Sequence, residues 1–207
     1  LSLLLFTGSY SYSLMSTRWN KELGNFSNIA TQAKNQQLLH SLLAGVQTFL
    51  ITDKKQKAAF FFIGDKTSLL AISRGGLYSG EYPEIFRLTS VENDKGLFDL
   101  VYQSSSTENV LLVATEQEIN FTEQLTLFSD LTSISFAYLG WSHFNEKTDD
   151  GEIIKPASWF EHFSGIDNQI MPTKMSITLT NEDGAFTLPV ELDQESELRL
   201  STFVDED

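Results

Sequence analysis

Apolar positions recur at helical spacing through the first fifty residues. From Trp19 onward the large or apolar side chains stand alternately four and three residues apart, at Trp19, Leu23, Phe26, Ala30 and Ala33. A wider apolar face follows between Leu38 and Leu50. Residues with this spacing share one side of an α-helix, and no proline occurs before Pro83, so the pattern predicts one long helix over residues 1–50.

A helix of this length exceeds what a compact domain needs, since it would extend about 75 Å at roughly 1.5 Å per residue. We therefore expect part of it to project and to bury its apolar stripe against other helices. The alternative interpretation is two helices that are hinged at Gly24-Asn25 and both fold back on the rest of the chain.

After residue 52 the pattern changes to short apolar or alternating runs separated by turn residues. The connections Asn93–Gly96 and Asn181–Gly184 are typical of β-hairpins. The longest stretch that we predict to be irregular is Gly140–Met171. The predicted strands are Ala58–Ile63, Ser68–Ser73, Ile85–Val91, Leu97–Gln103, Val110–Thr115, Phe121–Phe128, Leu131–Tyr138, Lys174–Thr180 and Ala185–Leu192.

A helix first and antiparallel strands afterwards favour an α+β fold, with a long N-terminal helix packed on antiparallel β-sheet. We therefore divide the chain into an N-terminal helix, residues 1–50, and a β-rich globular domain, residues 51–207. The sequence opens with the apolar run Leu1–Phe6 and carries no charged residue before Arg18. That run is shorter than the about 20 apolar residues of a membrane span, so we interpret it as the end of a hydrophobic helix whose first turns are missing.

Composition narrows the possible functions. The chain has 207 residues, of which 41% are hydrophobic and 12% aromatic, enough for one packed core. It has no cysteine, which excludes disulfides, thiolate metal sites and cysteine nucleophiles. The formal net charge is −14, with 10 Lys or Arg against 8 Asp or Glu in residues 1–100 and 4 against 20 in residues 101–207. Such an acidic half repels phosphate backbones, so we expect a solubilising surface and no nucleic-acid partner.

Few residues indicate a catalytic site, a metal site or a cofactor site, and we expect none of these three. The three histidines, His40, His143 and His162, match no zinc spacing, and no Gly-x-Ser-x-Gly segment occurs. The best calcium candidate is the carboxylate group of Asp149, Asp150 and Glu152, because hard cations prefer clustered carboxylates. It lacks the ligand alternation of an EF-hand, which favours a solvated acidic loop instead.

Several segments, in order along the chain, carry a resemblance to a known family. They are Leu3–Gly8, Trp19-Asn20-Lys21, Leu38–Leu50, Ala71–Gly76, Phe86-Arg87-Leu88, Ser135–Tyr138, and the hairpin from Met175–Thr180 to Leu188-Pro189-Val190. In these loose motifs the chain resembles the type IV pilin-like superfamily, most closely the J-type minor pseudopilins of type II secretion systems. The prepilin cleavage site and the Phe-led apolar run that follows it in that superfamily are absent from this sequence.

The resemblance implies a non-catalytic subunit, processed by a prepilin peptidase and held by its helix as a single-pass protein of the bacterial inner membrane. Its β-rich domain would lie in the periplasm. It would join other minor pseudopilins or pilins at the tip of a secretion pseudopilus and support protein export. The helix stripe from Trp19 to Ala33 would be the partner-binding surface, with small Ala30 and Ala33 allowing close approach.

Other functions remain open at the level of sequence. A minor type IV pilin involved in pilus assembly would show the same features. A membrane-anchored periplasmic domain that binds a ligand or glycan would use Trp141, Trp159 and Phe160 as its contact surface. An enzyme is the least supported class, since it would need His143 or His162 beside a carboxylate in a cleft.

Overall fold

The structure is a computed structural model. It describes residues 30–52, 58–78, 81–110, 112–114, 117–147 and 155–192. The chain divides into two compact units, Leu1–Leu38 and Leu39–Asp207, and each is described by itself. Of the first unit, the described part is residues 30–38, all helical. The predicted division after residue 50 stays a prediction.

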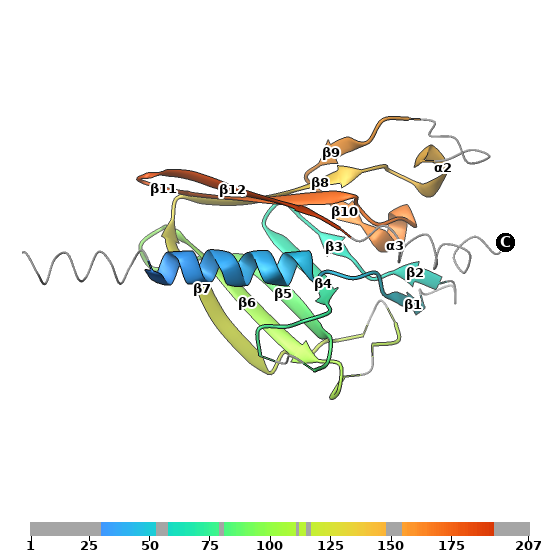
Figure 1. Cartoon of the computed structure of the whole chain (residues 1–207), viewed down its shortest axis with the longest axis horizontal. Helices are drawn as coiled ribbons and strands as arrows, with labels where there is room; N and C mark the ends of the chain where they lie inside the picture. Colours follow the sequence, from blue (N-terminus) through green and yellow to red (C-terminus); the bar gives the residue numbers. More distant parts are fainter. Residues whose placement is uncertain are drawn as a thin grey trace, which may run out of the picture. The chain divides into compact units, whose positions relative to one another are not determined.

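Two antiparallel sheets build the second unit (Figure 1). The larger sheet contains β3 (Ile63–Gly64), β4 (Ser68–Ser73), β5 (Glu84–Glu92), β6 (Phe98–Ser106), β7 (Glu123–Leu131) and β10 (Phe163–Ser164), in the order β10-β3-β4-β5-β6-β7. The smaller sheet contains β8 (Ser133–Gly140), β9 (Ser158–Phe160), β11 (Lys174–Asn181) and β12 (Gly184–Glu191), in the order β12-β11-β8-β9. A separate ribbon pairs β1 (Leu50–Thr52) with β2 (Ala58–Phe60), and two single helical turns are α2 (Phe144–Lys147) and α3 (Gly165–Asn168).

The predicted α+β class with a long N-terminal helix is wrong, because the fold is β-rich. Of the described residues, 49% lie in strands and 16% in helices. The helix covers residues 30–44 of the described chain, and residues 1–29, including the Gly24-Asn25 hinge, lie outside it. Beyond Gly45 the apolar pattern belongs to extended chain, since Val46 bridges to Ser73 and the amide of Gln47 donates to the carbonyl of Ile72 at 3.0 Å. Apolar residues that also fit a helical period therefore lie in extended chain that pairs with a strand.

One hydrophobic core joins the inner faces of both sheets. In β8 and β11 buried positions alternate with more exposed ones, as expected for strands with one face against a core. The last turns of the helix add Leu39, Leu42 and Leu43, none of which has any exposed surface. In Figure 1, β4–β7 and the strands of the smaller sheet lie on opposite sides of these turns.

The two sheets are tied together where Tyr138 of β8 lies over Gly64 of β3. The Tyr138 hydroxyl lies 3.0 Å from the carbonyl oxygen of Asp65 and 3.2 Å from that of Ser68, which accept its hydrogen bond. Burial raises the pKa of Tyr138, which keeps the phenol protonated as a donor. Phe62 packs edge-on against the Tyr138 ring, with ring centroids 5.6 Å apart. The absence of a side chain at Gly64 is what allows this contact, since a Cβ there would overlap the tyrosine ring.

Gly64→Ala should therefore lower the free energy of unfolding by about 1–3 kcal/mol, because the added methyl must displace a buried ring. Urea unfolding of the full chain measures the effect. Gly75→Ala is the matched control: a Cβ there meets no atom within 4 Å, so it should change stability by less than about 0.5 kcal/mol. Equal effects of the two substitutions would show that the Tyr138 contact does not constrain position 64.

A buried carboxyl group fixes the segment that follows β4. Glu84 is 1% exposed, and its Oε2 accepts a 2.6 Å hydrogen bond from the hydroxyl of Tyr102. Burial, with the bond to Glu84, raises the pKa of Tyr102. Tyr78 stacks on the Tyr102 ring and donates from its own hydroxyl to the carbonyl of Gln124 at 3.1 Å. Gly76 lies so close to the Glu84 carboxyl that a Cβ there would overlap it.

Tyr102→Phe should cost about 1–3 kcal/mol of unfolding free energy, because it removes a donor from a buried carboxyl group while keeping the ring. Thermal unfolding at constant pH checks this. Tyr78→Phe removes a hydroxyl from a ring that is 49% exposed, so its effect should be much smaller. A Tyr102→Phe protein as stable as the parent would contradict the assigned role of this hydrogen bond.

Candidate functional site

The end of the helix is anchored in the core. Leu39, Leu42 and Leu43 are buried, and the Ser73 hydroxyl of β4 donates to the carbonyl of Leu42 at 2.9 Å. This bond satisfies a carbonyl of the last helical turn, where no further helical donor follows. The amide of Gly45 donates to the carbonyl of Ser41 at 3.0 Å, and the chain then leaves the helix. The helix is thus held on one side and at its end.

The other side of the helix carries a continuous exposed stripe. Positions 30, 33, 37, 40 and 44 follow each other at spacings of three and four, and all five side chains are exposed. They are Ala30, Ala33, Gln37, His40 and Ala44, which we call the exposed stripe. Within the second unit, His40 and Ala44 stand at other positions of the helical period than the three buried leucines. It contains no Lys, Arg, Asp or Glu, and three of its five members are alanine.

Two of the five predicted partner-binding residues belong to this stripe. Ala30 and Ala33 lie on it and are exposed. Trp19, Leu23 and Phe26 lie outside the described residues, so their placement stays a prediction. The 4-3 spacing of those three positions continues without a break into the exposed stripe. Gln37, His40 and Ala44 were not among the predicted partner-binding residues, although helical phase alone extends the spacing to Ala44.

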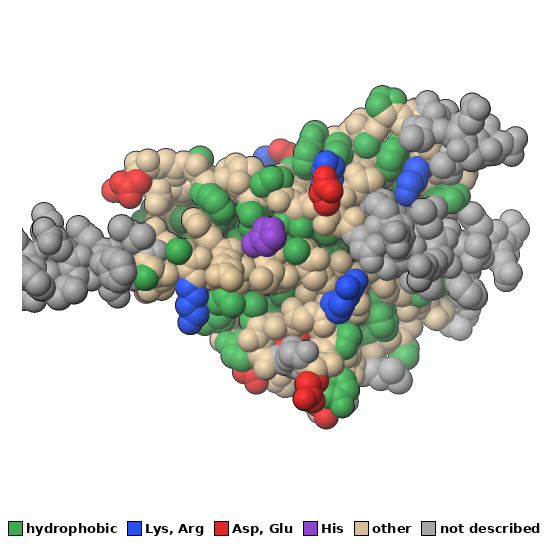
Figure 2. Space-filling model, viewed as in Figure 1, with side chains coloured by type: hydrophobic (Ala, Val, Ile, Leu, Met, Phe, Trp, Pro, Cys, Tyr) green, Lys and Arg blue, Asp and Glu red, His purple; other side chains and the backbone are tan. Residues whose placement is uncertain are grey.

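The face of the molecule shown in Figure 2 has few charged groups. Its Lys, Arg, Asp and Glu side chains appear singly or in small groups rather than as one acidic patch. The chain nevertheless has a formal net charge of −14.

The calcium candidates Asp149, Asp150 and Glu152 lie outside the described residues. The described flanks of their segment are joined: the indole nitrogen of Trp141 donates to the carbonyl of Lys155 at 2.7 Å. The ammonium group of Lys155 forms an ion pair with the Glu146 carboxylate, which also accepts from Ser142. Hydrogen bonds from Lys155 and Ser142 lower the pKa of Glu146 to about 2. Within the described residues, no three His, Asp or Glu side chains gather as a metal site.

The ion pair and hydrogen bonds of Glu146 predict an unusually low pKa for its carboxyl group. In an NMR titration of the carboxyl carbons, Glu146 should ionise near pH 2, below its ordinary pKa of 4.5. Lys155→Gln should raise the pKa of Glu146 toward 4.5, because it removes the largest cause of the shift. Lys174→Gln is the matched control: it should raise the pKa of Glu191, its own partner, and leave Glu146 unchanged. An ordinary pKa for Glu146 in the parent protein would show that Glu146 does not form these interactions with Lys155 and Ser142 in solution.

The structure does not gather Trp141, Trp159 and Phe160 on one surface. Trp141 is only 9% exposed, whereas Trp159 is 54% exposed. Trp159 and Phe160 are adjacent in β9, so their side chains point to opposite faces of the sheet, and Phe160 packs against Phe163 with ring centroids 6.1 Å apart. Trp159 is therefore the exposed member of this group.

The histidines also lie apart. The Nδ1 of His162 lies 2.7 Å from the Asp65 carboxylate, in a pair that is well exposed on both sides. The neighbouring residues form a second exposed ion pair, with Lys66 Nζ 2.8 Å from Glu161 Oε1. These two pairs link the β3–β4 turn to the two residues between β9 and β10. Among the described residues, neither His143 nor His40 forms an ion pair with a carboxylate.

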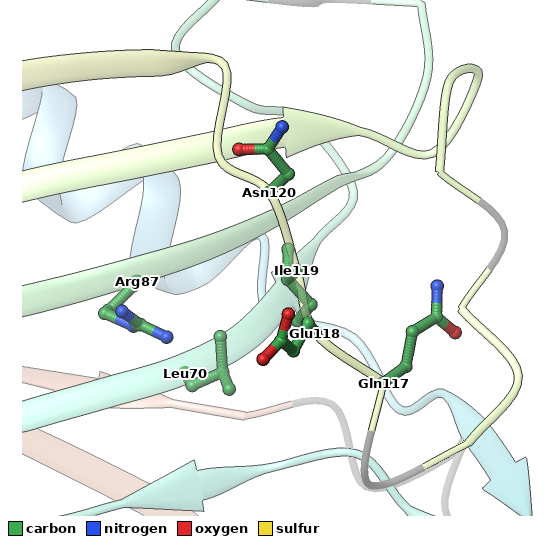
Figure 3. A pocket seen from close by; sticks show the side chains of 6 residues that line it. All are labelled: Leu70, Arg87, Gln117, Glu118, Ile119 and Asn120. Atoms are coloured by element: carbon green, nitrogen blue, oxygen red, sulfur yellow. The ribbon is translucent and has the colours of Figure 1, made fainter.

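A cavity of about 560 Å³ lies between β4, β5 and residues 117–120 (Figure 3). Leu70 and Ile119 supply its apolar wall, and Arg87 and Glu118 its charged groups. Gln117 and Asn120 complete the lining. Sequence reasoning missed this site because Arg87 stands in a strand thirty positions before the segment that faces it. The available signal was an arginine at an outward position of a strand in an acidic chain.

No known protein-family model matches this chain, and no curated protein sequence matches it. Among the described residues, no helix is long and apolar enough to cross a membrane.

Proposed function

We propose that this chain is a non-catalytic assembly subunit, which joins related subunits of a membrane-anchored fibre through one side of its N-terminal helix. In this role it acts as a minor pseudopilin that supports protein export by type II secretion, with the β-rich domain in the periplasm. The observation that carries the proposal is the exposed stripe, a set of uncharged exposed positions that follow one another at helical spacing. The resemblance in sequence supplies the kind of fibre.

The chemistry of the stripe suits helix–helix packing. Ala30, Ala33 and Ala44 are small enough to let a second helix approach closely, in water as in lipid. The five stripe positions are three and four residues apart, which is the spacing that keeps a seam facing a partner helix. Gln37 and His40 interrupt the apolar seam with polar groups, which in packed helices select one register at a cost in stability. The stripe therefore favours specific assembly over indiscriminate association.

Anchoring in the core holds the part of the helix that carries His40 and Ala44. The helix end cannot leave the core without exposing the large apolar side chains of Leu39, Leu42 and Leu43 to water. The burial of each side chain stabilises the fold by roughly 1.5–3 kcal/mol. The last turns of the helix therefore keep one face outward. A partner helix meets a surface that is already ordered, which lowers the entropic cost of binding.

Site-specific photo-crosslinking in cells tests the proposal. A photoreactive residue at Gln37, on the exposed stripe, should crosslink to membrane proteins that carry prepilin-type N-termini, identified by mass spectrometry. The same residue at Gln32, which is exposed but lies off the stripe, is the matched control and should give much less product. The identity of the partners also separates a secretion pseudopilus from a type IV pilus.

Charge substitution provides the second arm of this experiment. Ala30→Asp together with Ala33→Asp should reduce the crosslink from Gln37 by at least about tenfold, because packing would bury unpaired carboxylates. Gln32→Asp adds a carboxylate off the stripe and should leave the crosslink intact. Equal crosslinking from positions 32 and 37, or full crosslinking by the double variant, would refute assembly through this side of the helix.

A further inference from the structure

The cavity at Arg87 lies on the face of the larger sheet that turns away from the main core. Leu69 and Ala71 of β4 belong to that core, whereas Leu70 and Ile72 pack in a second apolar cluster with Ile85 of β5. Leu70 and Arg87 are direct register partners on this outer face. Residues 117–120 cover part of it, so the cavity has a sheet on one side and a separate chain segment on the other (Figure 3).

An aromatic ring helps to hold Arg87 at the cavity. Its guanidinium carbon lies over the Phe121 ring, 4.7 Å from the ring centroid. A guanidinium group held by such a cation–π interaction can still donate from its N–H groups to a ligand. The covering segment is fixed by the Ser105 hydroxyl, which donates to the carbonyl of Asn120 at 3.1 Å. The arginine is thus pre-organised for a planar acceptor such as a carboxylate, which it can bind through two parallel hydrogen bonds.

The other lining groups restrict the ligand further. Glu118 turns its carboxylate toward the Leu70 side of the cavity, and Leu70 lies between Glu118 and Arg87 in the view of Figure 3. A simple anion is disfavoured here, because it meets both Glu118 and a chain whose formal net charge is −14. A ligand that carries both a carboxylate and an ammonium group satisfies both charged residues. An apolar group on such a ligand would rest on Leu70 and Ile119.

From this geometry we infer that the cavity binds a zwitterionic ligand of the α-amino acid class with an apolar side chain. Arg87 receives the carboxylate, Glu118 receives the ammonium group, and Leu70 and Ile119 contact the side chain. The volume of about 560 Å³ lies within the usual range of small-molecule sites. This site is independent of the helix and of the assembly function proposed above.

An NMR titration with three probes tests the inference, followed at the methyl signals of Leu70 and Ile119 in the full chain. The probes are leucine, which carries both charges, N-acetylleucine, which lacks the ammonium group, and leucinamide, which lacks the carboxylate. We expect leucine to bind about three- to tenfold more tightly than either analogue, because each analogue loses one charge-assisted contact.

Three variants assign the contacts. Arg87→Gln should weaken leucine binding about tenfold, to the level of leucinamide, and Glu118→Gln should abolish the preference for leucine over N-acetylleucine. Arg74→Gln makes the same change at an arginine that does not line the cavity, and it should leave all three affinities unchanged. The inference is overturned if leucine shifts neither methyl signal, or if leucine and leucinamide bind the parent protein equally well.

Discussion

The contact between Tyr138 and Gly64 ties the two sheets together, through a buried ring that leaves no room for a side chain at position 64. Tyr138 belongs to the smaller sheet, yet its hydroxyl bonds to backbone carbonyls at the β3–β4 turn of the larger one. The amide of Phe136 adds a second link, donating to the carbonyl of Lys66 in the same turn at 2.8 Å. Between β9 and β10 only two residues carry the chain from one sheet to the other, and their ion pairs with Asp65 and Lys66 close this corner. Exposed pairs of this kind contribute little energy, so the buried ring and its hydrogen bond supply the constraint.

The end of the helix packs into the core that these two sheets share. The inner faces of both sheets and the leucines of the last helical turns form a single cluster, so the helix end is part of the core and not an attachment to it. The Ser73 hydroxyl closes the final turn, and a Cβ on Gly45 would come within 2.6 Å of its oxygen. With these leucines committed to the core, His40 and Ala44 of the same unit face outward. Core packing thus orients the part of the proposed assembly surface that lies at His40 and Ala44.

The outer face of the larger sheet is organised separately. Its own apolar cluster, around Ile72 and Ile85, joins Ile51 of β1, Leu112 and Ile119 to the sheet. The cavity at Arg87 forms at the border of that cluster, where Phe121 stacks on the guanidinium group. A β-sheet presents alternate residues to its two faces, so a single strand, β5, gives Phe86 and Leu88 to the main core and Arg87 to the cavity. The alternation lets substitutions at the cavity leave the core intact.

Local sequence patterns determined those strands and turns whose characteristic residues lie close together in the chain. The strand Ser68–Ser73 is confirmed as predicted, and so are the hairpins at Asn93–Gly96 and Asn181–Gly184, where Gly96 and Gly184 adopt positive φ. The predicted strand Ala58–Ile63 was only partly right, because it divides into β2 and β3, which pair with different partners.

The prediction of one long helix failed because residues 46–52 form backbone hydrogen bonds with other segments of the chain, a choice that helical spacing cannot reveal. Likewise β9 and β10 are too short to show a hydrophobic period. Residues 117–120 come to lie opposite Arg87 only when distant segments of the chain meet. Periodicity is a property of neighbours in the chain, whereas register and cavity lining depend on long-range pairing, so tertiary structure alone decided them.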